Sequence, residues 1–155
     1  MIQTNLCFLI RENEVILAMK KRGFGVGKWN GAGGKIKAGE NVRTAAIREV
    51  KEEIGVMVEE SDLEDHGILK FSFENNPDWD NETRLFVIKK WTNEPVESEE
   101  MRPQWYPKDA LPFNAMWVDD PNWLPKVLAG KKIEGEFLFT KDGSSMISFN
   151  VREVD

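Results

Sequence analysis

The sequence predicts an α+β fold in which helices pack against a mixed β-sheet, built as a single domain over residues 1–155. Short apolar runs separated by turn residues indicate strands near both ends of the chain. One amphipathic segment between them, residues 41–53, predicts a helix inserted among the strands. A length of 155 residues suffices for one compact core and is too short for two ordinary domains. Strands, then a helix, then strands again are typical of the α+β class.

The composition is that of a soluble globular protein, with 41% apolar and 31% charged residues. The 21 basic and 27 acidic side chains give a net charge of −6, which does not favour nucleic acid as the main partner. Apolar runs such as Leu6–Ile10 fall far short of the roughly 20 residues that cross a bilayer. The first residues lack the pattern of a secretory signal, and the single Cys7 cannot form an internal disulfide. We therefore expect a cytoplasmic protein without a membrane partner, in which Cys7 is an inert core thiol.

The N-terminal third is expected to contain a hairpin, a loop and a helix. Leu6–Ile10 and Val15–Met19 are apolar runs joined by a polar turn, which favours a β-hairpin. Seven glycines within Gly23–Gly39 exclude a helix there and indicate a loop whose backbone closely approaches another group. Asn41 is a suitable N-cap for the helix that follows, and Gly55 is a suitable residue for its end.

The rest of the chain is expected to consist of further strands and one more helix. Asp120 followed by Pro121 predicts a helix start, because Asp is a favourable N-cap and Pro suits the first helical position. Asp142-Gly143 between two apolar runs predicts a second hairpin. The expected elements are strands over Ile68–Phe73, Leu85–Trp91 and around Trp105, a polar connection over Asn75–Glu82, a helix over Asn122–Ala129, and hairpin strands over Gly135–Phe139 and Met146–Val151.

Three glutamates share one face of the first predicted helix. At 100° per residue, Glu49, Glu52 and Glu53 project from the same side, and their repulsion requires a positive partner such as the adjacent Arg48. Carboxylate oxygens beside a glycine-rich loop are what a Mg²⁺-assisted phosphate reaction requires, although a solvated acidic face would have the same spacing. A separate apolar stripe should bury against the sheet: Ala46, Ile47, Val50 and Ile54.

Residues 34–56 resemble the complete Nudix box, G-x5-E-x7-R-E-U-x-E-E-x-G-U, where U is aliphatic. The matching residues are Gly34, Glu40, Arg48, Glu49, Val50, Glu52, Glu53, Gly55 and Val56. The resemblance implies a Nudix fold, with a mixed β-sheet core sandwiched between α-helices, and hydrolysis of a nucleoside diphosphate linked to another group. It also implies a catalytic site in which Glu49, Glu52 and Glu53 hold Mg²⁺, with Mn²⁺ as a substitute, assisted by a backbone carbonyl near Gly33. Glu40 and Arg48 would brace the loop against the helix.

Segments outside the box resemble the MutT-homologue oxidised purine nucleoside triphosphatases. This second resemblance covers most of the chain, although residues 72–84 and the first few residues match poorly. The segments that carry it are Lys20–Gly25, Trp29–Gly31, Pro95–Ser98, Glu100–Pro103, Met116–Trp117 with Asp119–Asp120, and Arg152–Asp155.

The second resemblance implies a substrate pocket in which Asp119 and Asp120 read the edge of a purine. Two neighbouring carboxylates repel, so one should take up a proton easily and donate to a purine carbonyl while the other accepts from an amino group. Asp120 as a helix N-cap, Trp117 as a core residue and Glu100 as part of an exposed acidic turn are the structural alternatives. The other implied residues are Trp117 and Phe24 as pocket lining, Asn30 opposite the aspartates, Lys20 facing the pocket or phosphates, Glu100 near the metal, and Asn5 where the family has a threonine.

The predicted function is Mg²⁺-dependent hydrolysis of oxidised purine nucleoside triphosphates, such as 8-oxo-dGTP and 2-oxo-dATP, to the monophosphate and pyrophosphate. Such an enzyme would sanitise the nucleotide pool. The alternatives are a Nudix hydrolase of another nucleoside diphosphate substrate and a non-catalytic module that binds a nucleotide. The only expected partner is the small-molecule nucleotide, and we expect a monomer.

Overall fold

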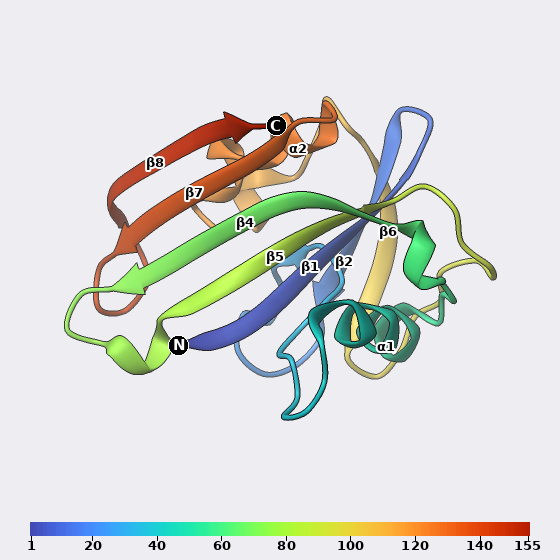
Figure 1. Cartoon of the computed structure of the whole chain (residues 1–155), viewed down its shortest axis with the longest axis horizontal. Helices are drawn as coiled ribbons and strands as arrows, with labels where there is room; N and C mark the ends of the chain where they lie inside the picture. Colours follow the sequence, from blue (N-terminus) through green and yellow to red (C-terminus); the bar gives the residue numbers. More distant parts are fainter.

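The computed structural model describes residues 1–155, whose eight strands form one mixed sheet (Figure 1). Along the sheet the order is β3-β2-β1-β5-β4-β7-β8, and β6 pairs with β2. The pairs β1–β5 and β4–β7 are parallel, and the other pairs are antiparallel. The strands are β1 (Ile2–Arg11), β2 (Glu14–Lys20), β3 (Trp29–Asn30), β4 (Leu63–Phe73), β5 (Asn81–Ile88), β6 (Met101–Pro107), β7 (Lys132–Phe139) and β8 (Met146–Val154).

Two α-helices and four short 3₁₀ turns complete the chain. None of the helices is long and apolar enough to span a membrane. The helices are α1 (Val42–Ile54) and α2 (Leu124–Leu128), and the 3₁₀ turns are η1 (Glu60–Asp62), η2 (Pro77–Trp79), η3 (Phe113–Ala115) and η4 (Asp120–Asn122).

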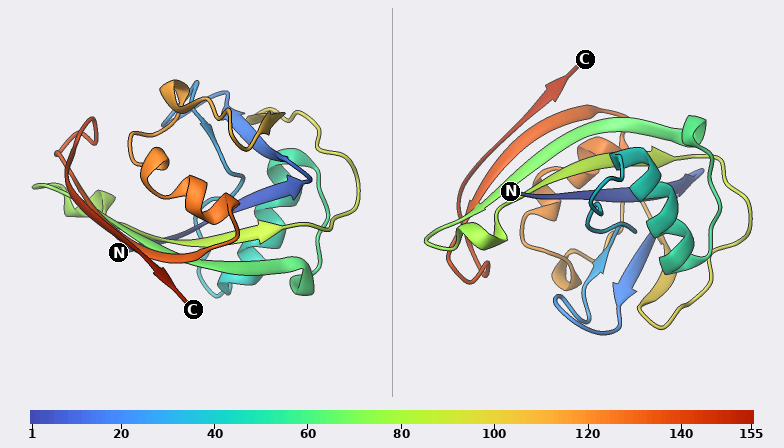
Figure 2. Two further views of the ribbon diagram at one scale, coloured as in Figure 1. Left: turned by 90° about the horizontal axis from the view of Figure 1, so that it is seen from above. Right: turned by 60° about the horizontal axis from the view of Figure 1, so that its bottom comes forward.

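The sheet separates two hydrophobic cores, one on each face. Successive side chains of a strand point to opposite faces, so Phe8 and Ile10 of β1 join the core that contains α2, whereas Cys7 and Leu9 join the core that contains α1. The long strands curve around α2, and α1 packs on the opposite face (Figure 2). The expected α+β fold, with a mixed sheet between helices, is confirmed.

Helix α1 begins and ends where the sequence predicts. The Asn41 side chain accepts a hydrogen bond from the backbone N–H of Thr44 at 2.8 Å. Gly55 ends the helix in the left-handed region with φ of 71°, and its N–H donates to the carbonyl of Lys51. The predicted apolar stripe faces the sheet, although Ile47 is only partly buried.

Pairing with β1 shifts the bounds of the fourth predicted strand. β5 runs from Asn81 to Ile88 rather than from Leu85 to Trp91, because it pairs residue by residue with β1 from Ile2 to Leu9. The parallel register brings the polar start of β5 into the sheet. Such a long-range pairing leaves no local sequence pattern.

The predicted start of the second helix is wrong. Asp120 does not cap a helix over residues 122–129; it is the first residue of η4, and neither η4 nor α2 has a side-chain cap. The chain between them turns at Trp123, whose indole is buried in the core. Burial of Trp123 therefore splits the segment into a 3₁₀ turn and a short helix.

A bulge in β4 makes Gly67 essential for stability. Gly67 has φ of 113°, and a Cβ placed there would lie 1.7 Å from the carbonyl oxygen of Ile133 on β7. We expect Gly67→Ala to lower the free energy of unfolding by about 3 kcal/mol in urea titration. Gly130→Ala is the control, because φ there is 92° but no atom lies within 4 Å, so only about 1 kcal/mol of backbone strain is expected. Equal losses in the two variants would contradict the steric argument.

Candidate active site

A cavity of about 300 Å³ lies between the inner face of the sheet and the segment that carries η4. It brings together residues from β1, β2, β3, the glycine-rich loop and η4, which are far apart in the sequence. All seven side chains predicted to bind substrate line it: Asn5, Lys20, Phe24, Asn30, Trp117, Asp119 and Asp120.

Two buried carboxyl groups occupy the inner end of the cavity. Asp119 and Asp120 are only 5% and 2% exposed. Asp119 Oδ2 accepts a hydrogen bond from the Trp123 indole N–H at 2.8 Å, whereas Asp120 Oδ2 has no partner. Burial raises the pKa of both groups, and the neighbouring charge of Asp119 raises the pKa of Asp120 further. Asp120 is therefore the member of the pair that holds its proton to the higher pH.

Trp123 holds Asp119 in place through this hydrogen bond. Its ring is 1% exposed and meets Phe8 edge to face at 5.9 Å. A buried indole N–H needs an acceptor, and Asp119 lies four residues earlier in the chain.

Aromatic rings form the mouth of the cavity. The ring of Phe24, on the loop after β2, stacks on Trp117 with centroids 5.3 Å apart, although Phe24 is 65% exposed. The Lys28 ammonium lies 5.1 Å from the centroid of Trp117. Gly25 allows the loop to approach, because a Cβ there would lie 3.0 Å from the Trp117 ring. Trp117 therefore lines the mouth of the cavity rather than the hydrophobic core.

Polar groups on β1 and β5 form a wall that the sequence did not indicate. The hydroxyl oxygens of Thr4 and Thr83 are 2.7 Å apart, and the Thr83 hydroxyl donates to Asn81 Oδ1 at 3.1 Å. All three line the cavity. These residues were missed because the parallel pairing of β1 with β5 brings them together across more than 70 positions.

The cavity is joined to α1 through one hydrogen bond. The backbone N–H of Gly33 donates to Glu53 Oε1 at 2.8 Å. Gly33 must lack a side chain, because its Cβ would lie 2.2 Å from the carbonyl oxygen of Asn5. Asn5 is itself buried, with Oδ1 accepting from the N–H of Gly34 at 3.4 Å and Nδ2 without a partner.

Glu53 has the most perturbed environment of the three box glutamates on α1. Its side chain is buried at 6% exposure. Burial raises the pKa of Glu53 to about 8, the hydrogen bond from Gly33 opposes the rise, and the charges of Glu49 and Glu100 add to it. A buried carboxyl group with two negatively charged neighbours is suited to binding a cation.

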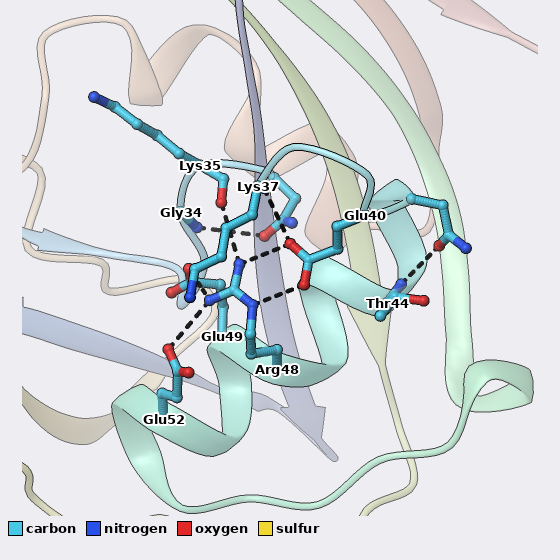
Figure 3. A network of polar contacts seen from close by, with 10 residues as sticks. Gly34, Lys35, Lys37, Glu40, Thr44, Arg48, Glu49 and Glu52 are labelled. Carbon is cyan, nitrogen blue, oxygen red and sulfur yellow. Dashed lines mark hydrogen bonds and ion pairs between the residues drawn. The ribbon is translucent and has the colours of Figure 1, made fainter.

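Arg48 is the positive partner that the glutamate face requires (Figure 3). Its guanidinium forms two hydrogen bonds with Glu40, of 2.8 and 2.9 Å, and contacts Glu49 at 2.8 Å and Glu52 at 3.1 Å. It also donates to the carbonyl of Lys35 at 3.3 Å, which ties the loop to α1. The hydrogen bonds from Arg48 lower the pKa of Glu40 to about 2, with help from the Lys37 N–H.

The predicted metal ligands offer the oxygen donors that Mg²⁺ prefers, but they are not drawn into one cluster. Arg48 pairs with Glu49 and Glu52, while Glu53 turns toward Gly33. No group of three or more His, Cys, Asp or Glu side chains is arranged to hold a metal ion. The donor types fit a hard divalent cation, and Arg48 balances their charge in this arrangement.

Glu100 lies on the acidic turn before β6 and influences the charge of Glu53. It is exposed, and the guanidinium of Arg22 approaches it to 3.5 Å. Lys21 pairs with Glu97 at 2.6 Å. Lys21 and Arg22 therefore bind the acidic turn, whereas Lys20 lines the cavity.

The chain is similar in sequence and in structure to known proteins. The NUDIX domain model matches residues 3–127. The chain is 41% identical over 150 residues to the mouse protein named oxidized purine nucleoside triphosphate hydrolase, covering 97% of this chain and 94% of that one. It is 43% identical over 134 residues to the Danio rerio protein of the same name, covering 86% and 84%. Among solved structures, a MutT protein from Bacillus halodurans superimposes with a TM-score of 0.82 at 26% identity, covering 97% of each chain. This chain belongs to the Nudix family.

Proposed function

We propose that this protein hydrolyses oxidised purine nucleoside triphosphates, such as 8-oxo-dGTP and 2-oxo-dATP, to the monophosphate and pyrophosphate. The observation that carries the proposal is the buried Asp119–Asp120 pair, which lines the same cavity that Gly33 connects to Glu53. The mouse and Danio rerio relatives, by their names, act on oxidised purine nucleoside triphosphates. We place the activity in a single-domain, monomeric, cytoplasmic enzyme that needs no nucleic-acid or membrane partner.

The aspartate pair recognises the edge of the base. A protonated Asp120 donates to a purine carbonyl, and an ionised Asp119 accepts from a purine N–H. Because Trp123 already donates to Asp119, the carboxylate keeps its orientation while it receives the base. Trp117 and Phe24 supply the stacking surfaces, and Asn30 contacts the base from the opposite side.

In the proposed complex, the glutamates of α1 would hold a divalent metal ion. The phosphates of the bound nucleotide would point toward that ion. Glu49, Glu52 and Glu53, with the backbone near Gly33 and with Glu100, would hold Mg²⁺, for which Mn²⁺ can substitute. The bound ion supplies neutralisation of phosphate charge and activation of the attacking water. Lys20 lines the cavity and would contact the triphosphate. Glu53 connects the glutamates of α1 to the cavity through its hydrogen bond from Gly33.

Arg48 positions the glutamates, and its replacement tests that role. Lys cannot form the two parallel bonds that Arg48 makes with Glu40 while also contacting Glu49. We expect Arg48→Lys to lower kcat about 10- to 100-fold and to leave KM nearly unchanged. Arg43→Lys is the matched control on the same helix, because Arg43 donates only to the carbonyls of Glu60 and Leu63. A similar loss in both variants would indicate damage to the helix rather than loss of ligand positioning.

The proposal is tested by kcat/KM for 8-oxo-dGTP, 2-oxo-dATP and unmodified dGTP with Mg²⁺, with pyrophosphate resolved from phosphate. We expect preference for an oxidised purine, pyrophosphate release, loss of turnover with EDTA and its recovery with Mg²⁺ or Mn²⁺. Equal or better turnover of dGTP would contradict the oxidised-purine assignment and favour another Nudix substrate. Absence of turnover with all three nucleotides would favour either another Nudix substrate or a nucleotide-binding module.

A further inference from the structure

Trp79 completes a row of aromatic rings that runs from one side of the cavity mouth to the other. It lies in η2, between β4 and β5. Its ring meets Phe24 edge to face at 5.4 Å and Phe73 edge to face at 5.6 Å. Phe24 in turn stacks on Trp117 at 5.3 Å. Trp79 is thus the link between the loop after β2 and the cavity wall formed by β4.

The segment that carries Trp79 is firmly held. The side-chain N–H of Asn81 donates to the Trp79 carbonyl at 3.1 Å, and Asp80 Oδ1 accepts from the N–H of Phe73 at 2.9 Å. Asn76 donates to the carbonyl of Lys141 at 3.0 Å, which ties η2 to the β7–β8 turn. The ring of Trp79 therefore projects from a braced turn.

The loop that carries Phe24 is built differently. Gly23, Gly25 and Gly27 all have φ near 85°, which glycine adopts without strain. Phe24 remains 65% exposed even though it touches two rings. A side chain so exposed gains little from burial, so its position depends on the rings that it contacts.

We propose that Trp79 is a positioning residue of the pocket, which holds Phe24 against Trp117 and so closes the cavity mouth beside a bound purine base. The inference deepens the proposed function, on which it rests for the identity of the ligand. Trp79 lies within residues 72–84, where the sequence departs from the triphosphatase resemblance. It therefore adds to the pocket a contact that the family motifs did not indicate.

The test compares Trp79→Ala, Trp79→Phe and the wild-type enzyme by two measurements. The first is the rate of limited trypsin cleavage after Lys21, Arg22 and Lys28, which flank Phe24 in the loop. The second is steady-state kinetics with 8-oxo-dGTP. For Trp79→Ala we expect cleavage and KM each to rise about 2- to 10-fold, with kcat within twofold of wild type. In Trp79→Phe, both the cleavage rate and KM should return most of the way to the wild-type values.

Phe149→Ala is the control for loss of a partly exposed aromatic ring. Phe149 is 49% exposed and stacks on Phe137 at 5.8 Å, and it does not line the cavity. This variant should match wild type in both measurements. The inference is wrong if the loop of Trp79→Ala is cleaved at the wild-type rate, or if faster cleavage leaves KM unchanged. The cleavage assay needs no substrate, so lack of turnover in the wild-type enzyme would contradict the proposed function separately.

Discussion

Glu53→Gln should lower kcat by a factor on the order of 10³ without unfolding the protein. The amide keeps an oxygen that can accept the Gly33 N–H, now at 2.8 Å from Glu53 Oε1, but it cannot bind a divalent cation as a carboxylate does. Burial disfavours the charged form of this side chain, so a neutral amide of the same shape should not cost stability. The measurements are kcat with Mg²⁺ and the thermal midpoint.

Glu60→Gln is the matched control for Glu53→Gln. Glu60 lies just beyond α1 in η1 and its side chain is exposed. The control should retain wild-type kcat and stability. If Glu53→Gln kept more than about a tenth of the wild-type kcat, Glu53 would not be an essential metal ligand. If its thermal midpoint fell sharply, the loss of activity would report on folding instead.

The second large effect is expected at Asp120. Asp120→Ala removes a group that is 2% exposed and faces the cavity, so kcat/KM for 8-oxo-dGTP should fall about 100-fold. Asp120→Asn is the informative partner, because its amide donates hydrogen bonds at every pH, as protonated Asp120 does only below its pKa. We expect Asp120→Asn to keep most of the wild-type kcat/KM at neutral pH. Equal losses in the two variants would argue against a donor role.

Asp120→Asn also tests how kcat/KM depends on pH. Burial and the charge of Asp119 raise the pKa of Asp120 well above its usual value, so Asp120 keeps its proton to a higher pH than an ordinary aspartic acid and loses it as pH rises further. Wild-type kcat/KM for 8-oxo-dGTP should therefore contain a limb that declines with rising pH. If Asp120 is the titrating donor, that limb should be missing from the pH profile of kcat/KM for Asp120→Asn. A declining limb unchanged in Asp120→Asn would assign it to another group.

The chemistry of α1 could be predicted because its signals are contiguous. The Asn41 cap, the Gly55 end and the glutamate spacing all lie within one stretch, and each depends on neighbours a few residues away. The Nudix assignment rested on the same stretch and is confirmed by the match over residues 3–127. Glu40 and Arg48, to which the resemblance assigned the bracing of the loop against the helix, form an ion pair at 2.8 Å.

The cavity could be predicted only in part, because its walls come from distant segments. Asp119 and Asp120 were identified through resemblance, but their burial and the bond from Trp123 depend on how η4 packs. Thr4 and Thr83 meet only through the register of two parallel strands, which no local pattern encodes. The position of Asp120 was misjudged as a helix cap because the sequence does not show that Trp123 will be buried.

The burial of Cys7 bears on how long this protein can survive oxidative stress. Cys7 is 1% exposed on β1, and burial, followed by the charges of Glu53 and Glu49, raises the pKa of its thiol. Oxidants attack the thiolate, so a buried and protonated thiol resists both hydrogen peroxide and disulfide exchange. The most exposed methionines are Met1 and Met57, at 68% and 48% exposure, and neither lines the cavity. In an enzyme that hydrolyses oxidised nucleotides, oxidation of the protein itself would thus occur first at methionines outside the substrate cavity.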